Sequence, residues 1–117
     1  MSSILNDTKK MLGIDESYDA FDLDITMNIN SALSTLSQLG VGPEEGFYIR
    51  DKSDTWDEIL NGDARLSNVK IYVYLKVRQI FDPPTTSNLA SSIDEQIKEL
   101  EWRINVEREK EIWKKGV

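Results

Sequence analysis

Two adjacent prolines, Pro83 and Pro84, divide the chain, because neither has an amide hydrogen and each disfavours the α conformation in the residue before it. The hydroxyl residues at 85–87 can cap a new helix. No helix breaker follows before Lys115, and apolar residues keep helical spacing at Leu89, Ile93, Ile97, Leu100 and Ile104. A helix of about 30 residues is about 45 Å long, whereas a domain of about 100 residues is about 34 Å across. The sequence therefore predicts a long C-terminal helix whose far end extends beyond its domain.

The segment before the prolines, residues 66–81, fits two patterns. Alternating apolar residues are typical of a half-buried strand, and they occur at Ile71, Val73, Leu75 and Val77. Helical spacing covers a longer window, with Leu66, Val69, Val73, Val77 and Ile80. Because this window is longer than a typical strand of about five or six residues, it favours a helix.

Two more helices are expected before residue 40. Residues 2–12 carry apolar groups at helical spacing and stop at Gly13, which suits a left-handed helix end. Asp19 is a candidate N-cap for the next helix, with Asp22 and Asp24 near its positive dipole end. The apolar stripe of that helix ends at Gly40 and consists of Phe21, Ile25, Ile29, Ala32, Leu33, Leu36 and Leu39.

Residues 40–46 contain three glycines and a proline, which predicts a loop. Ser53 or Asp54 can cap a small helix that residues 61–63 close, and its Trp56 is expected to pack over the core. The predicted fold class is mainly α, a small helical bundle with a long C-terminal helix and room for one short extended segment near residues 47–50. One domain is expected over residues 1–117, with residues 101–117 as a projecting C-terminal arm.

Composition excludes many functions. The 117 residues include no Cys and no His, so thiolate nucleophiles, Ser-His-Asp triads and Cys/His zinc sites are excluded. We therefore expect no enzyme, with no catalytic, cofactor-binding or metal-binding residue. A net charge of −7 opposes nucleic-acid binding, which depends on Lys and Arg contacts with phosphates. Neither a signal-peptide pattern nor an apolar stretch of membrane-spanning length occurs, which predicts a soluble cytoplasmic protein.

Two groups of residues permit a chemical interpretation as well as a structural one. The acidic residues from Asp15 to Asp24 could suggest a metal site, but they lack the glycine and distant Glu of an EF-hand loop, so helix capping is favoured. Tyr72 and Tyr74 lie among Lys and Arg residues and could form a base-stacking platform. The acidic charge balance favours an ordinary amphipathic helix flank there instead.

The C-terminal arm differs from the body in charge. Residues 1–97 carry 8 basic and 16 acidic groups, whereas residues 98–117 carry 6 and 5. Considered without the tryptophans, these charges fit a solvated helix with charge pairs such as Glu99–Arg103 and Glu111–Lys115. Trp102 and Trp113 on an overhanging helix favour partner binding, because an exposed Trp often anchors an interface.

Specific fragments resemble the small head-tail connector (adaptor, or head-completion) proteins of long-tailed bacteriophages. The likeness runs from Ile4 to about Arg108, and its most specific part is Phe81-Asp82-Pro83-Pro84 followed by Glu99-Leu100-Glu101-Trp102-Arg103. Other matching fragments, in order, are Leu12-Gly13-Ile14, Phe21-Asp22, Ile29-Asn30-Ser31-Ala32-Leu33, Leu39-Gly40-Val41-Gly42, Trp56 and the segment from Tyr72 to Arg78.

This resemblance implies a helical subunit of a ring, expected to be twelvefold, beneath the portal protein in the virion at the head-tail interface, after assembly in the host cytoplasm. Such adaptors extend the DNA channel, through which DNA passes without specific binding, and present a surface to the stopper or tail-completion protein. No catalysis and no membrane contact are implied. The competing interpretation is a cellular helical interaction or regulatory module that binds one partner through the C-terminal helix.

Three sets of residues are the candidate contacts of such an adaptor. The portal-binding set is Trp102, Arg103, Arg108, Trp113, Lys114 and Lys115. The downstream-connector set is Gly40, Val41, Gly42, Pro43 and Phe47. Acids expected to line the lumen and repel DNA are Asp15, Glu16, Asp19, Asp22, Glu44 and Glu45.

Overall fold

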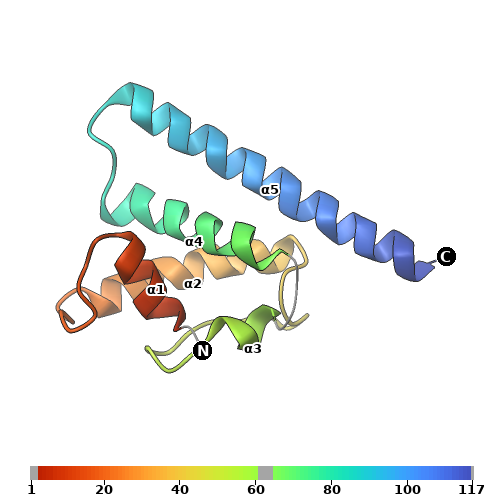
Figure 1. Ribbon diagram of the computed structural model, residues 1–117, viewed down its shortest axis with the longest axis horizontal. Coiled ribbons are helices and arrows are strands. Elements are labelled where there is room, and N and C mark those ends of the chain that lie inside the picture. Colours follow the sequence, from red (N-terminus) through yellow and green to blue (C-terminus); the bar gives the residue numbers. More distant parts are fainter. Residues whose placement is uncertain (1–2, 61–64, 117) are drawn as a thin grey trace.

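The computed structural model describes residues 3–60 and 65–116, with side chains described through Val106. These ranges form the helices α1 (Ile4–Met11), α2 (Asp22–Gln38), α3 (Trp56–Leu60), α4 (Leu66–Phe81) and α5 (Ser87–Gly116), and contain no strand. Figure 1 shows α4 between α2 and α5, with α3 on the side away from α5. The mainly α fold class is confirmed. Within the same ranges, no helix combines the length and apolarity that a membrane span requires.

Helix α4 is the centre of the bundle and packs against α1, α2 and α5. Its buried residues are Val69, Tyr72, Val73, Leu75 and Val77. A helix that is contacted on several sides buries more than one stripe. Burial on several sides accounts for Val73, Leu75 and Val77 of the alternating set, whereas Ile71 is 42% exposed. The helix that the longer window favoured is confirmed.

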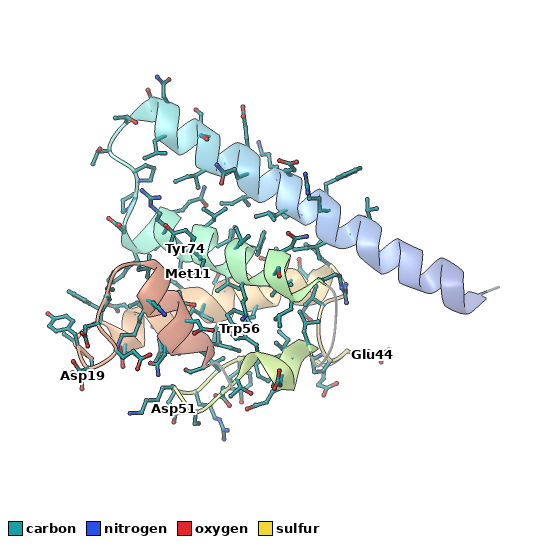
Figure 2. The ribbon with its side chains drawn as sticks, viewed as in Figure 1. Met11, Asp19, Glu44, Asp51, Trp56 and Tyr74 are labelled. Atoms are coloured by element: carbon teal, nitrogen blue, oxygen red, sulfur yellow. The ribbon has the colours of Figure 1, made fainter. Side chains whose placement is uncertain are left out.

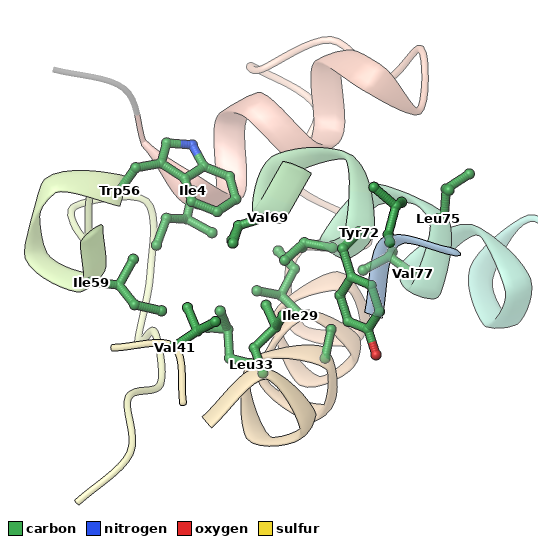
Figure 3. Close-up of a cluster of buried hydrophobic side chains, with 14 of the residues drawn as sticks. Ile4, Ile29, Leu33, Val41, Trp56, Ile59, Val69, Tyr72, Leu75 and Val77 are labelled. Atoms are coloured by element: carbon green, nitrogen blue, oxygen red, sulfur yellow. The ribbon is translucent and has the colours of Figure 1, made fainter. Parts of the chain in front are cut away.

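The core joins residues from all five helices, and Figure 3 shows its centre. Trp56 of α3 is only 2% exposed, as expected, and its indole Nε1 donates to Asp7 Oδ2 at 2.8 Å. The backbone amide of Thr55, just before α3, donates to Glu58 Oε1 at 3.2 Å. Asp54 does not cap this helix, because its carboxylate turns back and accepts the amide of Arg50 at 2.7 Å. The expected closure at residues 61–63 lies outside the described residues.

The segment near residues 47–50 is irregular and forms no strand. Its backbone is held by a side chain instead. Ile49 N donates to Asn30 Oδ1 at 2.7 Å, and Asn30 Nδ2 donates to Ile49 O at 3.0 Å. Because the Asn30 amide fills the role of a neighbouring strand, the buried Ile49 is fixed against α2 without a sheet.

Most of the helix ends lie where the sequence predicts them. Gly13 has φ of +81°, the predicted left-handed end of α1. Thr86 Oγ1 caps α5 by accepting the amide of Leu89 at 3.2 Å. The expected Asp19 cap of α2 is wrong: a separate turn, in which Asp22 N donates to the Asp19 carbonyl at 3.1 Å, precedes the helix, and its N-cap is Phe21.

Candidate interaction surfaces

Helix α5 packs along the outer side of the bundle, and its C-terminal part extends beyond the other helices. Ile93, Ile97, Leu100 and Ile104 are its buried residues. Beyond them the helix continues past the other helices, as Figure 1 shows. Near the point of departure, the Tyr72 hydroxyl donates to Glu101 Oε2 at 2.7 Å. This bond, together with the buried row, sets the direction in which the C-terminal part of α5 points.

Tyr72 itself belongs to the core. Burial and the hydrogen bond with Glu101 raise the pKa of its phenol, so the hydroxyl stays protonated and donates. A wholly buried ring cannot stack on a base, so the base-stacking interpretation fails at this residue. The pair of tyrosines therefore does not form a nucleic-acid platform.

Two residues of the portal-binding set have described side chains. Trp102 lies between the buried Leu100 and Ile104, on the opposite face of α5, and is 66% exposed. Arg103 forms the predicted ion pair with Glu99 at 2.8 Å. The side chains of the other four, Arg108, Trp113, Lys114 and Lys115, lie outside the described residues, as does the pair Glu111–Lys115.

The turn between α1 and α2 is built on a buried lysine. Lys9 Nζ lies 2.8 Å from Asp22 Oδ1 and donates to the Glu16 carbonyl at 3.0 Å. Hydrogen bonds from Ser17 lower the pKa of the Asp15 carboxyl. In the part of the chain that the structure describes, no three acidic residues lie close enough to hold a metal ion.

A hollow of about 510 Å³ lies beside this turn. Its wall carries the acids Glu16, Asp19, Asp22 and Asp51 together with the bases Arg50 and Lys52. The charge of the wall is therefore mixed. The buried lysine has a structural role here, because it fixes the position of the acidic turn.

Exposed acids collect along the side of the molecule opposite α5. Figure 2 shows Asp19, Asp51 and Glu44 along this side, which we call the acidic edge. Helix α3 lies on the same side and adds further carboxylates (Figure 1). The exposed acids in these segments are Asp15, Glu16, Asp19, Glu44, Glu45, Asp51, Asp57 and Glu58. The predicted lumen acids thus lie at the two ends of the acidic edge rather than in one cluster.

Three acids of this edge were missed by sequence reasoning. Asp51 precedes the small helix, and Asp57 and Glu58 lie in its first turn, where the sequence pattern indicated only a cap. The sequence feature that could have indicated these acids is the high density of acidic residues in 44–58. In the folded chain this segment lies on one exposed side.

The loop of the downstream-connector set is closely packed. Val41 is in the core, and Phe47 is partly buried against it. Gly42 has φ of +84°, and a Cβ there would lie 2.9 Å from Ile59 Cγ1. Val41 therefore anchors the loop. None of the five residues of the set is fully exposed, whereas the neighbouring acids Glu44 and Glu45 are.

An exposed apolar surface that the sequence did not predict lies where α2 begins and α4 ends. The Phe21 ring lies 5.6 Å from that of Tyr18 and 5.2 Å from that of Phe81, centroid to centroid. Next to it, a hollow of about 310 Å³ is lined by Asp24, Met27, Asn28, Ile80 and Phe81. We call Tyr18, Phe21, Met27, Ile80 and Phe81 the end patch.

The end patch comes from two distant stretches of sequence. Met27 and Ile80 are 62% and 63% exposed, and Phe21, which the sequence placed in a core stripe, is 41% exposed. Apolar surface of this kind is typical of protein contacts. The features of the described residues thus define a small helical protein that offers surfaces for assembly.

The comparisons with known proteins identify the family. The chain matches the model of the phage connector protein family over residues 4–111, and it therefore belongs to that family. The family is that of a structural virion component, as the resemblance implied. No curated protein and no solved structure matches the chain.

Proposed function

We propose that this phage connector is an adaptor subunit: it forms a ring beneath the portal, extends the DNA channel and carries the next connector, the stopper or tail-completion protein. The acidic edge is the observation that supports this role. If that side faces the lumen, its carboxylates repel the DNA phosphates and keep the wall free of adhesion. The channel then passes DNA without binding it.

The opposite side of the subunit carries α5, whose C-terminal turns we assign to the portal contact. Their sequence provides Arg108, Trp113, Lys114 and Lys115, an aromatic anchor among positive charges. The helix is continuous to Gly116, so these turns are held at a distance from the body.

Mixing the purified protein with the portal ring of the same phage tests this function. Sedimentation and particle imaging should detect a closed layer with the symmetry of the portal. Simple stoichiometric binding without a closed layer would favour a regulatory module, and no binding under packaging-like conditions would refute the adaptor role.

Deleting residues 113–117 should weaken portal docking by at least about tenfold, because a buried Trp anchor typically contributes 2 kcal/mol or more. The domain should stay folded, because the described core ends at Ile104. Circular dichroism checks the fold and sedimentation with portal rings measures docking. Unchanged docking would exclude these residues from the contact.

Reversing the charge at Asp19, Glu44 and Glu45 to lysine should slow DNA release while rings still form, because the wall would then attract phosphates. Asp22 is left unchanged, since it pairs with the buried Lys9. The control instead places lysine at Asn88, Ser91 and Glu95, which are exposed on α5, away from the acidic edge. Release should slow with the first variant only, and normal ejection from its particles would defeat the lumen assignment.

A further inference from the structure

The end patch lies toward one end of the longest axis of the molecule, which measures 49 Å, whereas the middle of α5 lies about halfway along that axis (Figure 1). A closed ring needs a head-to-tail contact, in which one surface of each subunit meets a different surface of the next. Two such surfaces are present here. One is the end patch, and the other is the turn of α5 around Trp102.

The two surfaces complement each other in chemistry. Asp24 lines the hollow of the end patch, and the exposed Asp82 directly follows Phe81, whereas no Lys or Arg lines that hollow among the described residues. On α5, Trp102 is flanked by Lys98 and Arg103, whose side chains are 72% and 56% exposed. A hollow lined by apolar side chains, Asn28 and an acid is thus complementary to an aromatic side chain beside bases.

Both bases are available to a partner. Lys98 pairs with Asp94 at 3.1 Å and Arg103 with Glu99 at 2.8 Å, each along the surface of its own helix. Exposed pairs of this kind contribute little and can exchange partners at small cost.

We propose that the end patch of each subunit receives Trp102 of a second copy of this chain, with Lys98 and Arg103 of that copy beside Asp24 and Asp82. This inference rests on the proposed function, because it specifies the lateral contact of the ring. It assigns Trp102 and Arg103 to the neighbouring copy and leaves the later turns of α5 to the portal.

Because the chain contains no cysteine, a thiol-specific crosslinker reacts only at cysteines that are introduced by substitution. Asn28→Cys places a thiol at the rim of the hollow, and Arg103→Cys places one beside Trp102. A short bismaleimide should join the two single variants when they are mixed on portal rings, and the double variant should give a ladder of joined copies. Tyr48→Cys, at a residue that is 68% exposed outside the end patch, replaces Asn28→Cys in the control.

Each outcome decides the proposal. Crosslinking of the Asn28 and Arg103 variants but not of the Tyr48 control supports it, and Met27→Asp or Trp102→Ala should then lower lateral association by about tenfold. A ring that forms without that crosslink, or one in which the control reacts equally, overturns the inference and leaves the adaptor function standing. Failure to form any ring on the portal overturns both.

Discussion

Replacing Tyr72 by alanine should lower the free energy of unfolding by about 3–5 kcal/mol, the usual cost of removing a buried aromatic ring. The side chain is wholly buried on the central helix, between α2 and α5, so its loss leaves a cavity that several elements would have to move to fill. The native stability of a domain is only about 5–15 kcal/mol, so this variant should be close to unfolding. Urea unfolding, followed by tryptophan fluorescence, measures the change.

Tyr72→Phe separates the ring from its hydroxyl. It keeps the packing and removes the hydrogen bonds of the hydroxyl, chiefly the one with the Glu101 carboxylate, so it should cost about 1.5–3 kcal/mol. If the phenylalanine variant lost as much stability as the alanine variant, the hydrogen bond rather than the packing would be the main contribution, and the cavity argument would be wrong.

The pH dependence gives a second readout of the same residue. The folded protein raises the pKa of Tyr72 above its unfolded value of about 10. The contribution of the protonated phenol is therefore fully present below pH 10 or so and is lost as the pH rises further. Tyr72→Phe should remove this part of the alkaline loss of stability.

Tyr72 also connects the core to the proposed portal contact. Glu101, which accepts its hydrogen bond, lies one residue before Trp102 and close to the end of the buried row on α5. In the phenylalanine variant the direction of the C-terminal turns is less fixed, so docking on the portal should weaken even where the fold survives.

The sequence predicted the helices because their signals are local. Prolines, glycines and hydroxyl caps act within one turn of the chain, so Gly13, Pro83 and Thr86 mark helix ends that the structure confirms. The cap of α2 failed because Asp19 participates in a separate turn that the local pattern does not distinguish from a helix start.

The surfaces were harder to predict, because they depend on how distant segments meet. Phe21 fits the core stripe by spacing, yet it lies at the end of the bundle and packs its ring against Phe81, sixty positions later, leaving part of it exposed. Trp102 was predictable, since a residue between two core positions of one helix faces outward by geometry alone. The acidic edge required the fold, which brings residues 15–19 and 44–58 to one side.

Gly42→Ala should cost about 2–5 kcal/mol of unfolding free energy, from two separate sources. Gly42 has φ of +84°, a conformation that costs an L-residue about 1–2 kcal/mol. The new Cβ would also lie 2.9 Å from Ile59 Cγ1, and Ile59 is buried in α3, so the overpacking adds about 1–3 kcal/mol.

Gly13→Ala is the matched control for this variant. Gly13 has φ of +81°, but a Cβ there would meet nothing within 4 Å, so only the conformational cost of about 1–2 kcal/mol applies. The difference in unfolding free energy between the two variants, measured in urea, isolates the contact between the loop and α3. A larger loss at Gly42 would mean that residues 40–47 are held rigidly on the body and offer any partner a preformed surface. Equal losses would mean that Ile59 moves aside, and the loop could then change shape when a partner binds.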